Sequence, residues 1–98
     1  GKKIIGFGSS ARSQTLLKYC DLNDNILSAI IDNNPLKQNL YTPTTSIPIV
    51  DFDKGMKQNP EVIIILAYNF QEEIVHQCKE AEYKGEFILP LPNTPHFL

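Results

Sequence analysis

A turn of small residues near the start of the chain has the composition of a phosphate-binding loop. Gly6, Gly8 and Ala11 approximate the spacing of the dinucleotide-binding fingerprint, in which small residues let the backbone approach a pyrophosphate. An apolar run precedes the turn and a helical pattern follows it, so free backbone N–H groups lie where an anion is favoured. We expect an anionic ligand there, and the alternative is a tight strand-to-helix turn that binds nothing.

Polar side chains around this turn add hydrogen-bond donors. Arg12 carries a planar guanidinium that matches phosphate oxygens, and serines surround it. The predicted chemistry is recognition of a phosphorylated or nucleotide-like ligand in a polar, electropositive notch. The residues assigned to substrate binding at the turn are Gly8, Ser9, Ser10, Ala11, Arg12 and Ser13.

Three residues elsewhere are further candidates for substrate binding. Asp32 can accept hydrogen bonds from ribose hydroxyls or cap its own turn, and Lys37 can meet a phosphate or stay in solvent. Asn69 can cap the next helix, with Glu72 completing a capping box, or contact a ligand. No nucleophile lies beside a base in a recognisable pattern, so we expect no catalytic residue in this chain.

Strands and helices alternate along the chain and must position these residues. Strands are expected at 3–7, 26–31, 47–50, 62–66 and 87–89, and helices at 13–20, at 51–58 and after Asn69. The apolar run 62–66 is mostly β-branched, which is typical of a strand buried on both faces. We predict a Rossmann-like three-layer α/β sandwich with a parallel five-stranded sheet of order 3-2-1-4-5.

The carboxyl ends of parallel strands meet at one edge of the sheet, and ligands bind where the strand order reverses. The loops expected to meet there are 8–13, 32–34, 67–69 and 90–93. On the last helix, we expect one apolar stripe to pack against the sheet. The stripe comprises Phe70, Ile74, Cys78 and Ala81.

Length, charge and cysteine content narrow the class of protein. A chain of 98 residues suits a single domain over 1–98, and a net charge of −2 argues against a nucleic-acid partner. No apolar run approaches the roughly 20 residues that span a bilayer, so we expect no membrane partner.

Cys20 and Cys78 fall at apolar helical positions, which indicates buried thiols in a cytosolic (cytoplasmic) protein. No metal-ligand spacing occurs, so we expect no metal. The chain begins at Gly1 and ends on Phe97-Leu98, which suggests a domain of a longer protein.

Several segments, in order, resemble the C-terminal domain of the S-adenosylmethionine-dependent sugar C-methyltransferases. The opening GFGSSARSQTLLKYC at 6–20 is similar to that family's Gly-Ala-Ser-Ala-(Lys/Arg)-Gly-Asn-Thr-Leu-Leu-Asn-Tyr-Cys. Further similar segments are DNNPLKQ at 32–38, PTTSIPI at 43–49, AYNFQEEI at 67–74 and GEFILPLP at 85–92. This chain has Ser13 and Gln14 where the family has Gly-Asn, Thr44 where glycine is usual and Tyr68 where tryptophan is usual. These departures leave the substrate open more than the fold.

The resemblance implies a role on the substrate side of a larger enzyme. In that family a zinc-binding segment and a methyltransferase domain precede this one and hold the catalytic residues and S-adenosylmethionine. This chain would hold no cofactor itself, would adjoin the methyltransferase domain of the same polypeptide, and would help to enclose a nucleotide-linked sugar. Two alternatives are a free-standing module that binds NAD or coenzyme A, and a purely structural domain that packs against its neighbours.

Overall fold

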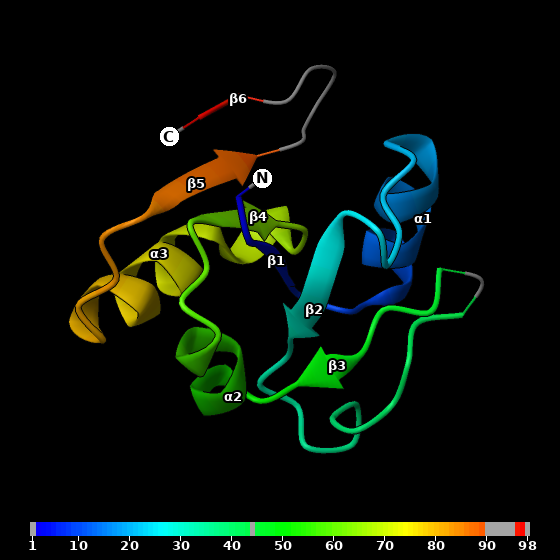
Figure 1. The fold of residues 1–98 in the computed structure, drawn as a ribbon, viewed down its shortest axis with the longest axis horizontal. Coiled ribbons are helices and arrows are strands. Elements are labelled where there is room, and N and C mark those ends of the chain that lie inside the picture. The colour runs from blue at the N-terminus through cyan, green and yellow to red at the C-terminus, as the bar shows by residue number, and fades with distance from the viewer. Residues whose placement is uncertain (1, 44, 90–95, 98) are drawn as a thin grey trace.

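The computed structural model describes residues 2–43, 45–89 and 96–97, with the backbone alone described at 11, 12, 68, 96 and 97. Five strands of the six-stranded sheet are parallel, in the order β3-β2-β1-β4-β5 (Figure 1). They are β1 (Ile4–Phe7), β2 (Leu27–Ile31), β3 (Ile49–Val50), β4 (Val62–Ile65) and β5 (Glu86–Leu89). The predicted Rossmann-like fold and strand order are confirmed. The sequence did not indicate β6 (His96–Phe97), which pairs antiparallel with β5 at the sheet edge.

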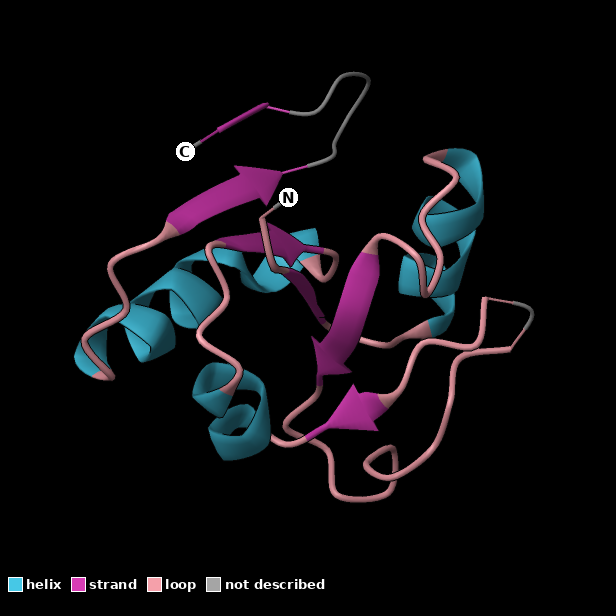
Figure 2. Ribbon diagram, in the orientation of Figure 1, coloured by secondary structure: helices cyan, strands magenta, loops and turns pink. Residues whose placement is uncertain are grey.

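Helices cover both faces of the sheet, as predicted (Figure 2). Helix α1 (Ala11–Tyr19) lies on one face, and α2 (Phe52–Lys57) and α3 (Gln71–Glu80) lie on the other. Leu16 and Leu17 of α1 pack with Ile30 and Leu66 in one buried cluster. The sheet therefore separates two cores, each closed by helices from one side.

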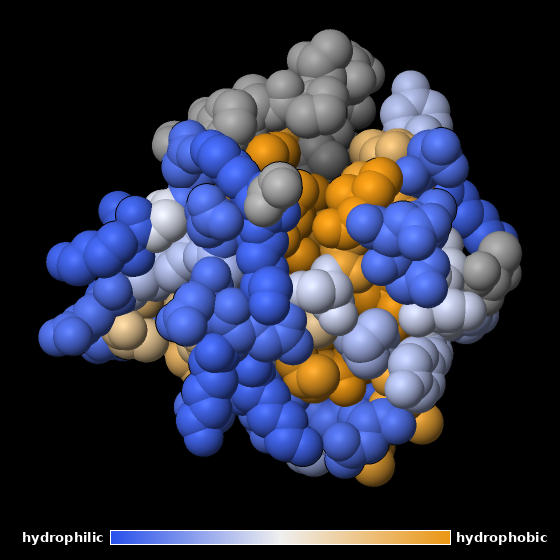
Figure 3. All heavy atoms as spheres, viewed as in Figure 1, coloured by the Kyte–Doolittle hydropathy of each residue, from blue (hydrophilic) through white to orange (hydrophobic). Residues whose placement is uncertain are grey.

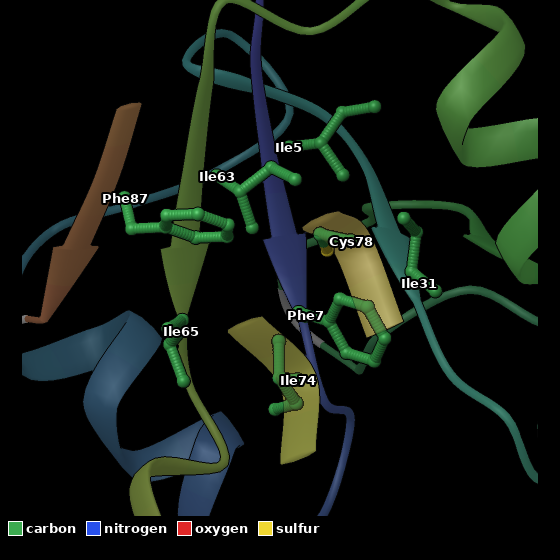
Figure 4. Close-up of a cluster of buried hydrophobic side chains, with 8 residues drawn as sticks. All are labelled: Ile5, Phe7, Ile31, Ile63, Ile65, Ile74, Cys78 and Phe87. Atoms are coloured by element: carbon green, nitrogen blue, oxygen red, sulfur yellow. The ribbon is translucent and has the colours of Figure 1, made fainter. Parts of the chain in front are cut away.

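The core under α2 and α3 is built from alternate residues of neighbouring strands, because successive side chains of a strand point to opposite faces. Figure 4 shows these side chains converging between the strands and α3. They are Ile5, Phe7, Ile31, Ile63, Ile65, Ile74, Cys78 and Phe87. All four residues of β4 are buried, which confirms the prediction that this run is a strand buried on both faces. Burying one such aliphatic side chain contributes about 1.5–3 kcal/mol.

The helix starts follow from their caps. Helix α1 begins at Ala11, earlier than predicted, because the Ser10 hydroxyl accepts a hydrogen bond from the Ser13 N–H at 3.3 Å. The Asp51 carboxylate caps α2 in the same way by accepting from the Lys54 N–H at 2.7 Å.

The cap predicted for the last helix is wrong. Residues Tyr68–Phe70 form a 3₁₀ turn, η1, and Phe70 rather than Asn69 occupies the N-cap position of α3, where no described side chain accepts a capping hydrogen bond. The tighter turn directs residues differently from an α-helix. Phe70 is 57% exposed as a result, so the predicted apolar stripe is correct for Ile74 and Cys78 and wrong for Phe70. Ala81 is exposed too, because it is the C-cap, one residue after the last turn.

The two cysteines differ in burial. Cys78 is fully buried, as predicted, whereas Cys20 is half-buried because it is the C-cap of α1. Neither forms a disulfide. Among the described residues, no helix has both the length and the apolar content needed to cross a membrane.

Candidate functional site

The turn between β1 and α1 depends on the conformational freedom of Gly8. Gly8 has a φ of +106°, a region that residues with a side chain rarely adopt. Its N–H donates to the Ile31 carbonyl oxygen at 2.8 Å, and a Cβ at this position would lie 2.6 Å from the Ala67 Cβ. The turn is thus in close contact with the ends of β2 and β4, at the carboxyl edge of the sheet.

The Asp32 carboxylate fixes this turn. One of its oxygens, Oδ2, accepts hydrogen bonds from the Ser9 N–H at 3.0 Å and from the Ser9 hydroxyl. The other, Oδ1, accepts from the Asn34 N–H at 2.8 Å. Asp32 therefore caps its own turn, which was one of the two predicted interpretations. A carboxylate offers about four acceptor positions, so roughly one is left for a ribose hydroxyl.

The loop after β2 brings a cation to the same turn. The Lys37 ammonium donates to the Ser9 carbonyl oxygen at 3.5 Å, and the Gln38 side-chain amide donates to the Asp32 carbonyl oxygen at 2.8 Å. Lys37 is half-buried rather than freely solvated. Its charge lies beside the turn where the sequence predicted an anion.

A hollow of about 220 Å³ opens at this edge. It is lined by Phe7, Gly8, Ser9, Ser10, Asp32, Asn33, Ala67, Phe70 and Ile74. Residues from three of the four loops predicted to meet at the carboxyl edge are present, and loop 90–93 lies outside the described residues. Whole-ligand pockets hold about 300–1,000 Å³, so this hollow suits one part of a larger ligand.

The structure brings together four of the predicted site residues at the hollow. Gly8, Ser9, Ser10 and Asp32 line it. Ser13 is fully buried, with its hydroxyl 3.2 Å from that of Ser10, so it supports the turn from beneath instead of facing the hollow.

The remaining predicted residues lie around the hollow. Asn69 is exposed and outside the lining, and Lys37 lies beside the turn. Ala11 and Arg12 have their backbone in the first turn of α1, and their side chains are outside the described part of the structure. Among the described lining residues, Asp32 is the one ionisable side chain, and the predicted electropositive character of the notch stays a prediction that depends on Arg12.

Of the five described lining residues that were not predicted as site residues, two have exposed side chains, Asn33 and Phe70. The Asn33 amide donates to the Gln77 Oε1 at 3.0 Å and accepts from the Gln77 Nε2 at 3.4 Å, which joins the loop after β2 to α3. Phe70 offers an exposed aromatic ring at the edge of the hollow. In the sequence, Asn33 was indistinguishable from a turn former and Phe70 from a core residue.

A larger hollow, about 580 Å³, lies at the opposite edge of the sheet. Two polar contacts lie within its lining: the Lys2 ammonium lies 3.4 Å from the Glu86 carboxylate, and the Tyr83 hydroxyl donates to the Glu86 carbonyl oxygen at 3.2 Å. Burial raises the pKa of Tyr83 to about 12, so its hydroxyl stays protonated. Despite its size, this hollow is not lined by the Gly8 turn, which lies at the carboxyl edge.

Comparison with known proteins identifies the family. Residues 1–92 match the model of the C-methyltransferase C-terminal domain. This chain belongs to that family. The C-methyltransferase NovU of Streptomyces niveus is 32% identical to it over 93 residues, which are 94% of this chain and 22% of NovU. The resemblance drawn from the sequence motifs is therefore confirmed, and this chain spans under a quarter of the length of that relative.

A solved structure supports the fold. This chain is similar to UDP-D-quinovosamine 4-dehydrogenase from Vibrio fischeri, with a TM-score of 0.68 over 99% of this chain and 93% of the other. The two sequences are 15% identical, so the similarity shows a shared Rossmann-type architecture alone.

Proposed function

We propose that this domain binds a nucleotide-linked sugar at the carboxyl-edge hollow and presents it to an S-adenosylmethionine-dependent methyltransferase domain of the same polypeptide. The observation that carries the proposal is the position of the hollow, directly at the N-terminus of α1 in a member of a C-methyltransferase family. Ligands of open α/β sheets bind at this edge. The domain would act in the cytoplasm on a small anionic substrate.

The diphosphate of such a ligand fits the start of α1. The first N–H groups of a helix lack partners within it, and the helix dipole favours negative charge there. Ser10 lines the hollow, and Arg12 follows in the first helical turn. Lys37 adds a positive charge beside the turn, at the Ser9 carbonyl oxygen. These groups would hold the phosphates away from the Asp32 carboxylate.

The uncharged part of the ligand fits the other side of the hollow. Asp32 retains an acceptor position for a sugar hydroxyl, and the Asn33 amide offers a donor and an acceptor. Phe70 provides an apolar ring for a sugar or base to lie against. The contribution to methyl transfer would be orientation of the substrate carbon, because holding reactants in the right geometry lowers the entropic part of the barrier.

Substitution of Arg12 in the full-length enzyme tests the proposal. Loss of a charge-assisted hydrogen bond costs about 1.5–3 kcal/mol, so Arg12→Ala should raise the KM for the sugar nucleotide by roughly 10- to 100-fold. Lys18→Ala removes a cation from the last turn of the same helix and should leave the KM unchanged. An unchanged KM in both variants would refute the phosphate role of this turn.

A further inference from the structure

The loop that joins β2 to β3 presents apolar side chains to solvent. Leu36 is 84% exposed, Leu40 is 52% exposed and Tyr41 is 69% exposed, all within six residues. We call these three residues the loop patch. Figure 3 shows apolar atoms projecting at the lower right margin of the molecule, over the β2–β3 loop. Clustered exposed apolar side chains of this kind mark interaction surfaces.

The same stretch of chain is depleted of charge. Between Asp32 and Asp51 the sequence contains one charged residue, Lys37, although 20% of the whole chain is charged. The Lys37 ammonium lies against the Ser9 carbonyl oxygen, toward the domain. By contrast, α3 carries exposed Glu72, Glu73, Lys79 and Glu80. A low content of charged residues, together with aromatic and aliphatic side chains, is typical of the core of a protein interface.

Backbone hydrogen bonds hold the loop patch in a fixed conformation. The Asn39 N–H donates to the Ile49 carbonyl oxygen at 2.9 Å, and the Ile49 N–H donates to the Leu40 carbonyl oxygen at 2.8 Å. Tyr41 forms an antiparallel bridge with Pro48. A surface ordered before binding loses less conformational entropy when a partner docks.

The inner side of this loop bonds directly to the candidate site. Lys37 contacts Ser9, and Gln38 contacts Asp32, both of which line the hollow. A partner that covered the loop patch would therefore lie next to the hollow. It would also fix the loop that holds the glycine turn.

We propose that the loop patch is the docking surface for the methyltransferase domain of the same polypeptide. This inference rests on the proposed function, because methyl transfer requires the donor-bearing domain to lie beside the hollow. More than three quarters of the relative NovU lies outside the part aligned with this chain, which provides ample protein to cover the loop. The loop patch carries no charge, and its loop bonds to Ser9 and Asp32 of the hollow, so we expect that protein to pack there.

Hydroxyl-radical footprinting of the full-length protein tests the proposal with two tyrosines as an internal pair. Tyr41 and Tyr19 are 69% and 78% exposed in this domain, so they should be oxidised at similar rates if neither is covered. Docking at the loop patch predicts that Tyr41 is oxidised about tenfold more slowly than Tyr19, since an interface core is closed to solvent. Equal rates would overturn the proposal.

Two controls identify the occupant. The double variant Leu36→Ser, Leu40→Ser should restore fast oxidation of Tyr41, whereas Ile26→Ser, at another exposed apolar position, should leave it slow. Protection that disappears on dilution as a dimer dissociates would identify a second copy as the occupant and overturn the proposal. The footprint needs no sugar nucleotide, so the two proposals can fail separately. A protected Tyr41 together with an unchanged KM in Arg12→Ala would contradict the proposed function and leave this inference standing.

Discussion

The carboxylate of Asp32 binds both the backbone N–H and the hydroxyl of Ser9, which lies 23 residues earlier in the chain. This pair joins the end of β2 to the turn after β1. It fixes the turn before any ligand arrives, because the hydrogen bonds form within the domain itself. The residue type that binds ribose in related folds serves here mainly to hold the glycine turn.

A double-mutant cycle measures this pair. Asp32→Ala should lower the free energy of unfolding by about 1.5–3 kcal/mol, because it removes charge-assisted hydrogen bonds from partly buried donors. Ser9→Ala should cost about 1 kcal/mol. Urea denaturation of both single variants and the double variant should give a coupling of at least about 0.5 kcal/mol. Strictly additive effects would show that the two residues do not stabilise one another.

Alanine at Gly8 should destabilise the fold through two separate effects. Gly8→Ala places a Cβ 2.6 Å from the Ala67 Cβ and forces a side-chain residue to a φ of +106°. Strain of this kind costs about 1–3 kcal/mol from the backbone alone. Adding Ala67→Gly should recover part of the loss by removing the Cβ contact, while the backbone strain remains. Thermal unfolding of the single and double variants measures both parts, and a fully stable Gly8→Ala variant would contradict the described turn.

Stability should fall at alkaline pH because of Cys78. Burial raises the pKa of its thiol from 9.0 to about 11, so the folded chain keeps a proton that the unfolded chain loses. The stabilisation is complete below about pH 9 and is lost as the pH rises toward 11. Urea unfolding across this range should show a decreasing free energy of unfolding.

The matched variants isolate the thiol. Cys78→Ala should lower the free energy of unfolding at every pH by loss of packing, and should also flatten its alkaline decline. Cys20→Ala retains Cys78 and should show the same alkaline decline as the unaltered chain. Tyr83, whose pKa burial raises to about 12, adds a decline at higher pH. An identical slope in Cys78→Ala and in the unaltered chain would exclude the thiol as its source.

The parallel sheet was predictable because the relevant signals are local, and the strand order followed from the usual winding of such sheets. The uninterrupted run in β4 and the alternation of strands with amphipathic helices define a parallel sheet without knowledge of long-range contacts. The glycine turn was located for the same reason, since Gly8 and the Ser10 cap act within a few residues.

The missed features depend on contacts between distant segments. Phe70 fits an apolar stripe by spacing, but the 3₁₀ turn before α3 moves it into solvent beside the hollow. Asn33 contacts Gln77 across 44 residues, and Lys37 contacts Ser9 across 28. Local sequence patterns do not indicate contacts between residues so far apart in the chain. The residues that line the hollow could therefore not be deduced from the sequence.

Titration of the isotope-labelled chain with a nucleoside diphosphate sugar, such as dTDP-glucose, tests the central claim most directly. Amide resonances recorded by NMR should shift most at Gly8, Ser10 and Arg12, with smaller shifts at Asn33 and Phe70, because the ligand would lie over the turn and against these two residues. Shifts confined to the opposite edge, around Lys2 and Tyr83, or no shifts at saturating ligand, would contradict the assignment of the carboxyl-edge hollow as the substrate site.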